Sequence, residues 1–291
     1  MDDPSKVDAF VSFGKLADTY GEQYQASGRR HRYPANQFRL RIVLDLLESV
    51  QPRRILDVGC GTGEPLIEIR KRGFHIEGFD YAEEVVEKAR RNLESAGLPR
   101  NLVHHNNMED IRGIAPGAYD CIIALGSVYY ARDLDKTINN IVDLLPSGGS
   151  FIFSVRNDLF SLFSLNEYTV NFMWRHLIPA EALSKEAKLA VEKFLNDRCA
   201  EANVERKFQT VDDLNIHSVY HNPLTVENEL LNPHGLTLEG RYYYHFHALP
   251  PIFEHTMPEE FRRVSMEMED AGDWRGLFMS SAFIVHARKS Q

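Results

Sequence analysis

The sequence is poor in cysteine, has no excess of positive charge and contains no long apolar run. Its three cysteines, Cys60, Cys121 and Cys199, lie far apart without a CxxC pair, which favours reduced thiols in a cytoplasmic protein over a disulfide framework or a zinc site. A formal net charge of −9 disfavours a sequence-independent grip on nucleic acid, because such binding needs a basic surface. No stretch approaches the roughly 20 apolar residues of a membrane-spanning helix, so we expect no membrane partner.

The order of apolar patterns indicates an α/β protein. Beyond residue 50, apolar runs of strand length alternate with segments whose apolar residues recur at three- and four-residue spacing, which predicts a parallel sheet with helices on both faces. We divide the chain into a helical cap (1–50), an α/β core (51–157), a helical and aromatic-rich insertion (158–215) and C-terminal strands (216–291). The insertion either covers a substrate pocket or forms the buried side of an accessory layer.

The stretch "ILDVGCGTG" places three glycines, which have no side chain, between a predicted strand and a predicted helix. Gly59, Gly61 and Gly63 have GxGxG spacing, which differs from the GxGxxG of dinucleotide-binding folds. Pro65 in the first helical turn removes one N–H that a diphosphate would use. Asp80 closes the next strand, where a carboxylate accepts both hydroxyls of a ribose. Together these residues favour a nucleoside ligand without a diphosphate.

With "NNMED", "YDCIIALG" and "LLPSGGSFIFSV", this stretch resembles the motif series of class I S-adenosylmethionine-dependent methyltransferases over about residues 50–157. The resemblance implies a Rossmann-like sheet of seven strands, the last antiparallel, with S-adenosyl-L-methionine as cofactor. Many relatives have aspartate where this chain has Asn107, so the change keeps an acceptor and removes a charge. The implied cofactor-binding positions are Asp57, Gly59, Gly61 and Gly63 at the methionine part, Asp80 at the ribose, Tyr81, Asn107 and Met108 at the adenine, and Leu125 and Gly126 near the sulfonium.

Several members of that family hold the methionine carboxylate with an N-terminal tyrosine and arginine. Tyr20, Tyr24, Arg29 and Arg32 are the candidates here, and we favour Tyr24 and Arg32. Arginine suits the task because its guanidinium binds a carboxylate through two parallel hydrogen bonds. The alternative is that "RRHR" is a solvated basic turn.

The segment "VRN" after the fifth strand resembles small-molecule N-methyltransferases of the glycine and sarcosine type. That partial likeness implies that Arg156, beside Asn157, binds an anionic group of the substrate, and Tyr130 is a further candidate for substrate contact. Ligands of open α/β sheets bind beyond the carboxyl ends of the strands, which agrees with these positions. The alternative is that Arg156 pairs with a local acid such as Asp158.

Methyl transfer needs orientation and, where the nucleophile carries a proton, a base. Histidine suits the proton transfer because its pKa lies near neutrality, so His217 and His221 are our candidates, with Tyr129 as an oxygen or ring contact near the sulfonium. His245 and His247 alternate along a later strand and are weaker candidates. For each of these side chains the plainer alternative is packing.

The sequence therefore predicts an enzyme that transfers a methyl group from S-adenosylmethionine to an O or N atom of a small, anionic or partly apolar metabolite. Alternatives are a non-catalytic S-adenosylmethionine-binding protein, a methyltransferase of protein or RNA, and, more remotely, a dinucleotide oxidoreductase. The acids Asp120, Asp133 and Asp135 form no clear cluster of oxygen ligands, so we expect no metal. The oligomeric state is left open, with a homodimer as one option.

Overall fold

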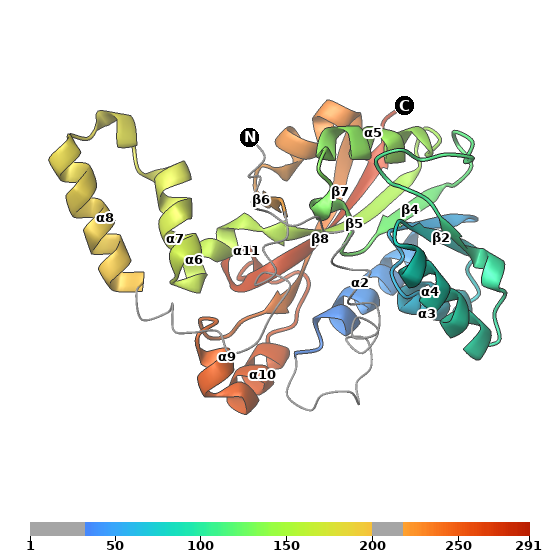
Figure 1. Ribbon diagram of the computed structural model, residues 1–291, viewed down its shortest axis with the longest axis horizontal. Coiled ribbons are helices and arrows are strands. Elements are labelled where there is room, and N and C mark those ends of the chain that lie inside the picture. Colours follow the sequence, from blue (N-terminus) through green and yellow to red (C-terminus); the bar gives the residue numbers. More distant parts are fainter. Residues whose placement is uncertain (1–32, 200–217) are drawn as a thin grey trace.

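The computed structural model describes residues 33–199 and 218–291, and these residues form one mixed sheet with helices on both faces (Figure 1). The sheet has eight strands in the order β3-β2-β1-β4-β5-β8-β7, with β6 pairing on β5. Pairs β1–β2, β1–β4, β2–β3, β4–β5 and β5–β6 are parallel. The strands are β1 Ile55–Val58, β2 Ile76–Asp80, β3 Val103–His105, β4 Cys121–Ala124, β5 Ser150–Asn157, β6 Tyr220–His221, β7 Leu236–Phe246 and β8 Ser280–Lys289.

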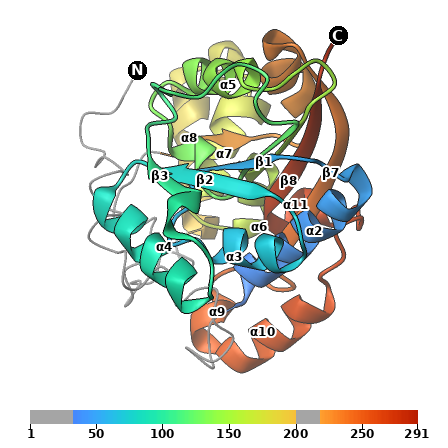
Figure 2. The same cartoon turned by 90° about the vertical axis from the view of Figure 1, so that its right-hand side faces the viewer.

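Two layers of helices cover the central strands (Figure 2). Helices α2 Ala35–Val50, α3 Glu64–Lys71 and α4 Glu83–Ser95 lie on one face, and α5 Leu134–Asp143 lies on the other. Because side chains alternate along a strand, β5 sends Phe151 and Phe153 toward α5 and Ile152 toward α2. Strands β1 and β4 are buried along their whole length, which explains their continuous apolar runs in the sequence.

The C-terminal strands complete the sheet in the expected way. Strand β8 is antiparallel to both of its neighbours, β5 and β7, and lies between them although it follows both in the chain. The Rossmann-like sheet whose last strand is antiparallel is thereby confirmed. Strand β7 runs in the same direction as β5, so its carboxyl end reaches the same edge of the sheet as the glycine loop.

The segment after β5 projects away from the sheet. Following η4 Asp158–Phe160 and α6 Ser161–Ser164, helices α7 Glu167–Phe172 and α8 Lys185–Cys199 form an arm at the left of Figure 1. They pack on each other through Val170, Leu195 and Cys199, while Phe194 remains 57% exposed. Within the described part of the predicted insertion, residues 158–199, it is the beginning that lies beside the sheet. Its role as a substrate cover stays a prediction.

Three further helices, α9 Phe253–Thr256, α10 Pro258–Glu267 and α11 Gly276–Met279, connect β7 to β8. Within the two described stretches, no helix is both long and apolar enough to span a bilayer. The three cysteines are free thiols in buried positions.

Candidate cofactor and acceptor site

The loop between β1 and α3 depends on glycine for its backbone conformation and for its close contacts. Gly59, Gly61 and Gly63 have φ angles of 73°, 56° and 85°, a region that side-chain-bearing residues rarely adopt. A Cβ on Gly59 would also lie 2.4 Å from the Cβ of Ser127, whose hydroxyl donates to the carbonyl oxygen of Val58 at 2.7 Å. The loops that follow β1 and β4 are thus in direct contact, and Gly59 makes that contact sterically feasible.

Asp57, under this loop, is a buried acid whose carboxylate lacks a protein partner. Its side chain is 1% exposed, and neither carboxylate oxygen has a hydrogen-bond partner among the described residues. Burial, together with the negative charge of Asp80, raises the pKa of Asp57 to about 7, although the nearby charge of Arg39 lowers it. An unpartnered buried carboxylate is costly, so the site is suited to a cationic ligand group. The ammonium of a methionine tail fits this requirement.

Arg39 lies beside Asp57 and was not identified from the sequence. It is 3% exposed on the sheet-facing side of α2, in phase with Ile42 and Val43. A Cβ on Gly126 would lie 2.7 Å from Nη1 of Arg39, so the guanidinium reaches the end of β4. A buried arginine next to a buried aspartate offers complementary charges to both ends of an α-amino acid. The available signal was an arginine on the apolar stripe of an otherwise ordinary amphipathic helix.

Asp80 lies at the end of β2 with its carboxylate facing the glycine loop. One carboxylate oxygen accepts the N–H of Gly61 at 2.9 Å, and the other accepts the N–H of Ala82 at 3.2 Å. Burial raises the pKa of Asp80, while these backbone donors lower it. A carboxylate has about four acceptor positions, so two remain for the hydroxyls of a ribose.

The predicted adenine-contacting residues gather next to Asp80. Tyr81 is 43% exposed and its ring lies 6.0 Å from the ring of His105, which ends β3. The side-chain oxygen of Asn107 accepts the N–H of Glu109 at 2.9 Å, and Met108 is buried in the α5-side core. Their contact with adenine stays a prediction.

Three tyrosines surround Arg156 at the carboxyl end of β5. Its guanidinium donates to the hydroxyls of Tyr220 at 3.2 Å and Tyr130 at 3.3 Å. The central carbon of the guanidinium lies 5.4, 5.9 and 5.6 Å from the ring centroids of Tyr129, Tyr130 and Tyr220. Aromatic faces attract a cation and carry no net charge themselves, so these three rings position the guanidinium at the end of β5.

Tyr129 connects this cluster to the cofactor end of the site. Its hydroxyl would lie 3.5 Å from a Cβ on Gly126, so it borders the end of β4. Burial raises the pKa of Tyr129 well above its usual value, although Arg156 and Arg39 lower it. At neutral pH the side chain is therefore a neutral phenol that can both donate and accept a hydrogen bond.

Asn157 and Asp158 have partners that differ from those considered in the sequence. The amide nitrogen of Asn157 donates to the carbonyl oxygens of Gly276, Leu277 and Ser280 at 3.2, 3.0 and 2.8 Å. Its amide thus ties β5 to α11, a use that leaves little capacity for substrate. Asp158 pairs with Arg175 and His176, both at 3.3 Å, and these are its ion pairs in the described part of the chain.

His221 is half-buried and lies on the opposite face of the sheet from Arg156. Residues paired in register point to the same face, and Arg156 pairs with Tyr220 whereas Asn157 pairs with His221. Burial lowers the pKa of His221 to about 4, and its Nε2 has no hydrogen-bond partner within residues 33–199 and 218–291. The imidazole is therefore neutral at physiological pH, and it faces away from Arg156.

Three predicted residues, Tyr24, Arg32 and His217, lie outside the described residues. Across the described ranges, no group of three or more histidine, cysteine or acidic side chains is arranged to hold a metal ion.

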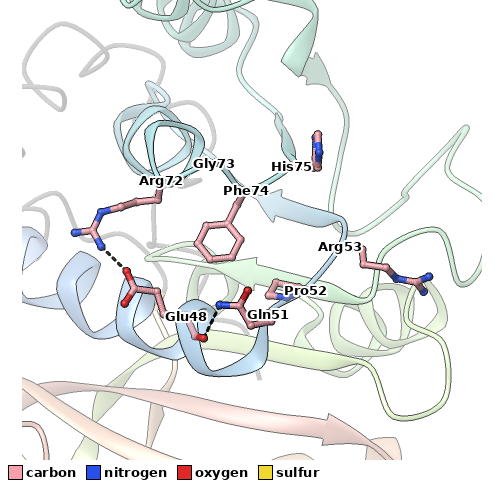
Figure 3. Close-up of a pocket in the computed structure, with 8 residues that line it drawn as sticks. All are labelled: Glu48, Gln51, Pro52, Arg53, Arg72, Gly73, Phe74 and His75. Carbon is pink, nitrogen blue, oxygen red and sulfur yellow. Dashed lines mark hydrogen bonds and ion pairs between the residues drawn. The ribbon is translucent and has the colours of Figure 1, made fainter.

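A shallow groove at the opposite end of the strands is a poor candidate for this chemistry. Figure 3 shows residues 48–53 on one side and 72–75 on the other, before β1 and β2 begin. Its charged groups already have partners, since Arg72 pairs with Glu48 at 2.5 Å and Arg53 with Asp120 at 3.3 Å. Ligands of open α/β sheets bind at the carboxyl edge, which is the edge of Asp57 and Arg156.

Comparison with known proteins agrees with this arrangement. Residues 27–190 match a family described as a methyltransferase domain. The ubiquinone biosynthesis O-methyltransferase of Vibrio atlanticus is 27% identical over 213 residues, which cover 72% of this chain and 83% of that protein. An S-adenosyl-L-methionine-dependent Diels-Alderase of Talaromyces variabilis is 29% identical over 100 residues, 34% of each chain. The chain spans 53%, 45% and 34% of the length of the first three curated relatives it matches.

Among solved structures, magnesium protoporphyrin IX methyltransferase from Synechocystis, with bound SAH, superposes with a TM-score of 0.57. The match covers 97% of this chain and 98% of that one at 14% identity, which supports the fold.

Proposed function

Because this chain belongs to the class I S-adenosylmethionine-dependent methyltransferases, we propose that it methylates an O or N atom of a small molecule that carries an anionic group. The observation that carries the proposal is the pair of unpartnered, buried carboxylate oxygens on Asp57 beneath the glycine loop. Since this carboxylate needs a cation, a ligand with an ammonium group is favoured over a phosphate or a bare nucleotide.

We propose the following roles for the cofactor-binding residues. Asp57 holds the methionine ammonium, Arg39 holds the methionine carboxylate, and Asp80 accepts the two ribose hydroxyls. When bound, S-adenosylmethionine supplies a methyl group that is already activated by its positively charged sulfur. The chain's remaining tasks are therefore to orient the acceptor, exclude water and manage a proton.

For the acceptor we propose that Arg156 binds an anionic group and that Tyr129 orients the nucleophile. The tyrosine cluster supports this assignment, because its three rings fix the guanidinium at the carboxyl edge of the sheet. A fixed positive charge also lowers the pKa of a neighbouring acidic hydroxyl, which reduces the need for a strong protein base. Tyr130 acts through its hydrogen bond to Arg156.

A direct proton-transfer role for His221 is less favoured by its orientation. Its neutral imidazole meets the protonation requirement of a base, but the register pairs it with Asn157 on the face opposite Arg156. We therefore route no proton through His221. A His221→Gln variant that loses all turnover while binding cofactor normally would reverse this assignment.

The test begins with calorimetric titration of S-adenosylhomocysteine into the wild type and Asp80→Ala. Loss of the ribose contact should weaken binding by roughly 1–3 kcal/mol, the scale of a lost charge-assisted hydrogen bond. Unchanged affinity would remove Asp80 from the cofactor site. Methyl transfer is then measured with methyl-labelled S-adenosylmethionine against a panel of carboxylates that carry hydroxyl or amino groups, for the wild type and Arg156→Gln.

A second candidate is a protein that binds S-adenosylmethionine without transferring its methyl group. One relative of this chain is named as an S-adenosyl-L-methionine-dependent Diels-Alderase, so the proteins similar to this chain include one named for a reaction other than methyl transfer. This alternative predicts tight cofactor binding and no labelled product with any acceptor in the panel. Methyl transfer that depends on Arg156 would exclude it.

A further inference from the structure

His247 is a buried histidine that none of the proposed roles uses. Its side chain is 5% exposed, and neither ring nitrogen has a hydrogen-bond partner in the part of the chain that the structure describes. A buried polar group left unpaired costs on the order of 1–3 kcal/mol, and native proteins seldom retain one without a use. Two such nitrogens on one ring point to a polar group that the protein itself does not supply.

Aromatic rings form a box around this imidazole. The ring centroid of His247 lies 4.7 Å from that of Phe160, 5.3 Å from that of Phe261 and 4.8 Å from that of His245. Phe160 comes from η4, Phe261 comes from α10, and His245 is the residue of β7 two positions before His247. The planar faces of these rings suit contact with an aromatic or other flat apolar ring. The imidazole suits a single hydrogen-bonding substituent on that ring.

A strained residue turns the two histidines toward the α2 side of the sheet. His245 has φ of 61°, unusual for a residue with a side chain. Regular alternation would put Phe246 on the same face as Tyr244, yet Phe246 belongs to the α5-side core and Tyr244 to the α2-side core. His245 instead stacks on Tyr33, just before α2, at 5.0 Å. The alternation therefore slips by one residue at His245, which brings His247 to the α2 side.

Arg156 lies on that same side. It pairs in register with Ala282 of β8, which in turn pairs with Tyr244 of β7. His247 follows Tyr244 by three residues and lies just beyond the end of β7 at Phe246. His247 is thus separated from Arg156 by β8 and by the last residues of β7, which is a suitable position for the far end of an elongated acceptor.

We propose that His247 and its aromatic box form a distal subsite of the acceptor pocket, which binds a hydroxyl-bearing apolar ring. The inference rests on the proposed function, because it assigns the acceptor of the same site. An acceptor of this class has an anionic group at Arg156 and a ring hydroxyl at His247. The imidazole is a specificity-determining residue that hydrogen-bonds the hydroxyl and takes no part in the methyl transfer.

The experiment compares p-cresol with toluene, which differ only by the hydroxyl, on the full chain saturated with S-adenosylhomocysteine. Binding is followed by NMR in the wild type, in His247→Leu and in the control His104→Leu, which replaces an exposed histidine of β3. We expect the wild type and the control to prefer p-cresol by roughly tenfold, the effect of one hydrogen bond to a buried group. In His247→Leu the preference should fall to about one, with toluene affinity retained.

A second readout covers the case in which His247→Leu fails to fold. In the wild type, p-cresol should shift an imidazole ¹⁵N resonance of His247, whereas toluene should leave it nearly unchanged. Equal p-cresol preference in the wild type and His247→Leu, or no saturable p-cresol binding, would overturn the subsite. Failure of the wild type to bind S-adenosylhomocysteine would instead count against the proposed function, so the two failures are distinguishable.

Discussion

At the scale of single residues, the site is defined by polar groups that are buried at a cost. Neither carboxylate oxygen of Asp57 has a hydrogen-bond partner among residues 33–199 and 218–291, and the pKa of this group is raised to about 7. Such a group destabilises the protein on its own and is compensated when a cation binds. The same carboxylate oxygens therefore lower the stability of the unliganded protein and, in their proposed role, bind the cofactor. Ionisable groups with shifted pKa values are common at functional sites.

Replacing Asp57 with asparagine should stabilise the unliganded protein and weaken its binding of the cofactor. The folded pKa of Asp57 is raised, so its contribution to the free energy of unfolding is greatest below pH 4 and is lost as pH rises through 7. At pH 8 and without cofactor, Asp57→Asn should unfold at higher urea than the wild type, with a gain of about 2 kcal/mol. Calorimetry should show that its S-adenosylhomocysteine binding falls at least tenfold. A variant that is less stable than the wild type at pH 8 would contradict this account.

Gly59 permits a direct test of close packing, because Gly113 has the same φ of 73°. A Cβ at Gly113 meets nothing within 4 Å, whereas a Cβ at Gly59 would overlap Ser127. Gly113→Ala should therefore cost about 1 kcal/mol from backbone strain alone. Gly59→Ala should cost more, by roughly 1–3 kcal/mol of overpacking, as measured by urea unfolding. Equal losses in the free energy of unfolding for the two variants would show that the loop after β4 moves to accommodate the added Cβ without cost.

At the scale of elements, α2 links the cofactor end of the site to the acceptor end. Arg39 on this helix lies beside Gly126, and Tyr33 just before it stacks on His245. The hydroxyl of Tyr33 is also hydrogen-bonded to Glu269, which follows α10. A shift of α2 would therefore alter both ends of the pocket together.

Arg39→Gln should weaken cofactor binding, while Arg41→Gln on the exposed side of α2 should not. The loss at Arg39 should be roughly 10–100-fold in the dissociation constant of S-adenosylhomocysteine, the scale of a lost buried ion contact. Because Arg39 lowers the pKa of Asp57, the variant should also bind less tightly at pH 6 than at pH 8, a range in which the ammonium of the ligand stays charged. Equal losses for the two variants would indicate a general effect on α2.

The elements of the α/β core were predictable because each depends on local patterns. Apolar runs and glycine turns specify β1, β2, β4 and β5 within a few residues, and the spacing of the loop indicated the ligand. The sequence did not reveal Arg39, because an isolated arginine on an apolar stripe signals nothing without its neighbours. The sequence also suggested a regular strand through His245 and His247. In the structure His245 is left-handed, and the two histidines contact Tyr33 and α10. Such tertiary contacts override local preference and have no short-range signature.

At the scale of the whole molecule, stability should depend on pH and cofactor together. Burial raises the pKa values of Asp57 and Asp80, so the unliganded protein loses stability as pH rises from about 4 to 7. Cofactor binding favours the ionised forms and releases protons. Saturating S-adenosylhomocysteine should therefore raise the melting temperature more at pH 8 than at pH 5.5, as followed by calorimetry. A pH-independent shift would show that neither carboxylate changes ionisation on binding.

The position of β8 between β5 and β7 also determines when the sheet can be completed during translation. Strands β5 and β7 are both synthesised before β8, and neither touches the other in the finished sheet. Until β8, Ser280–Lys289, has left the ribosome, β5 and β7 each have an edge with unpaired backbone groups. Such edges can pair with strands of other chains. The nascent chain therefore completes its cofactor half before its acceptor half, so we expect it to need protection from aggregation until β8 has been synthesised.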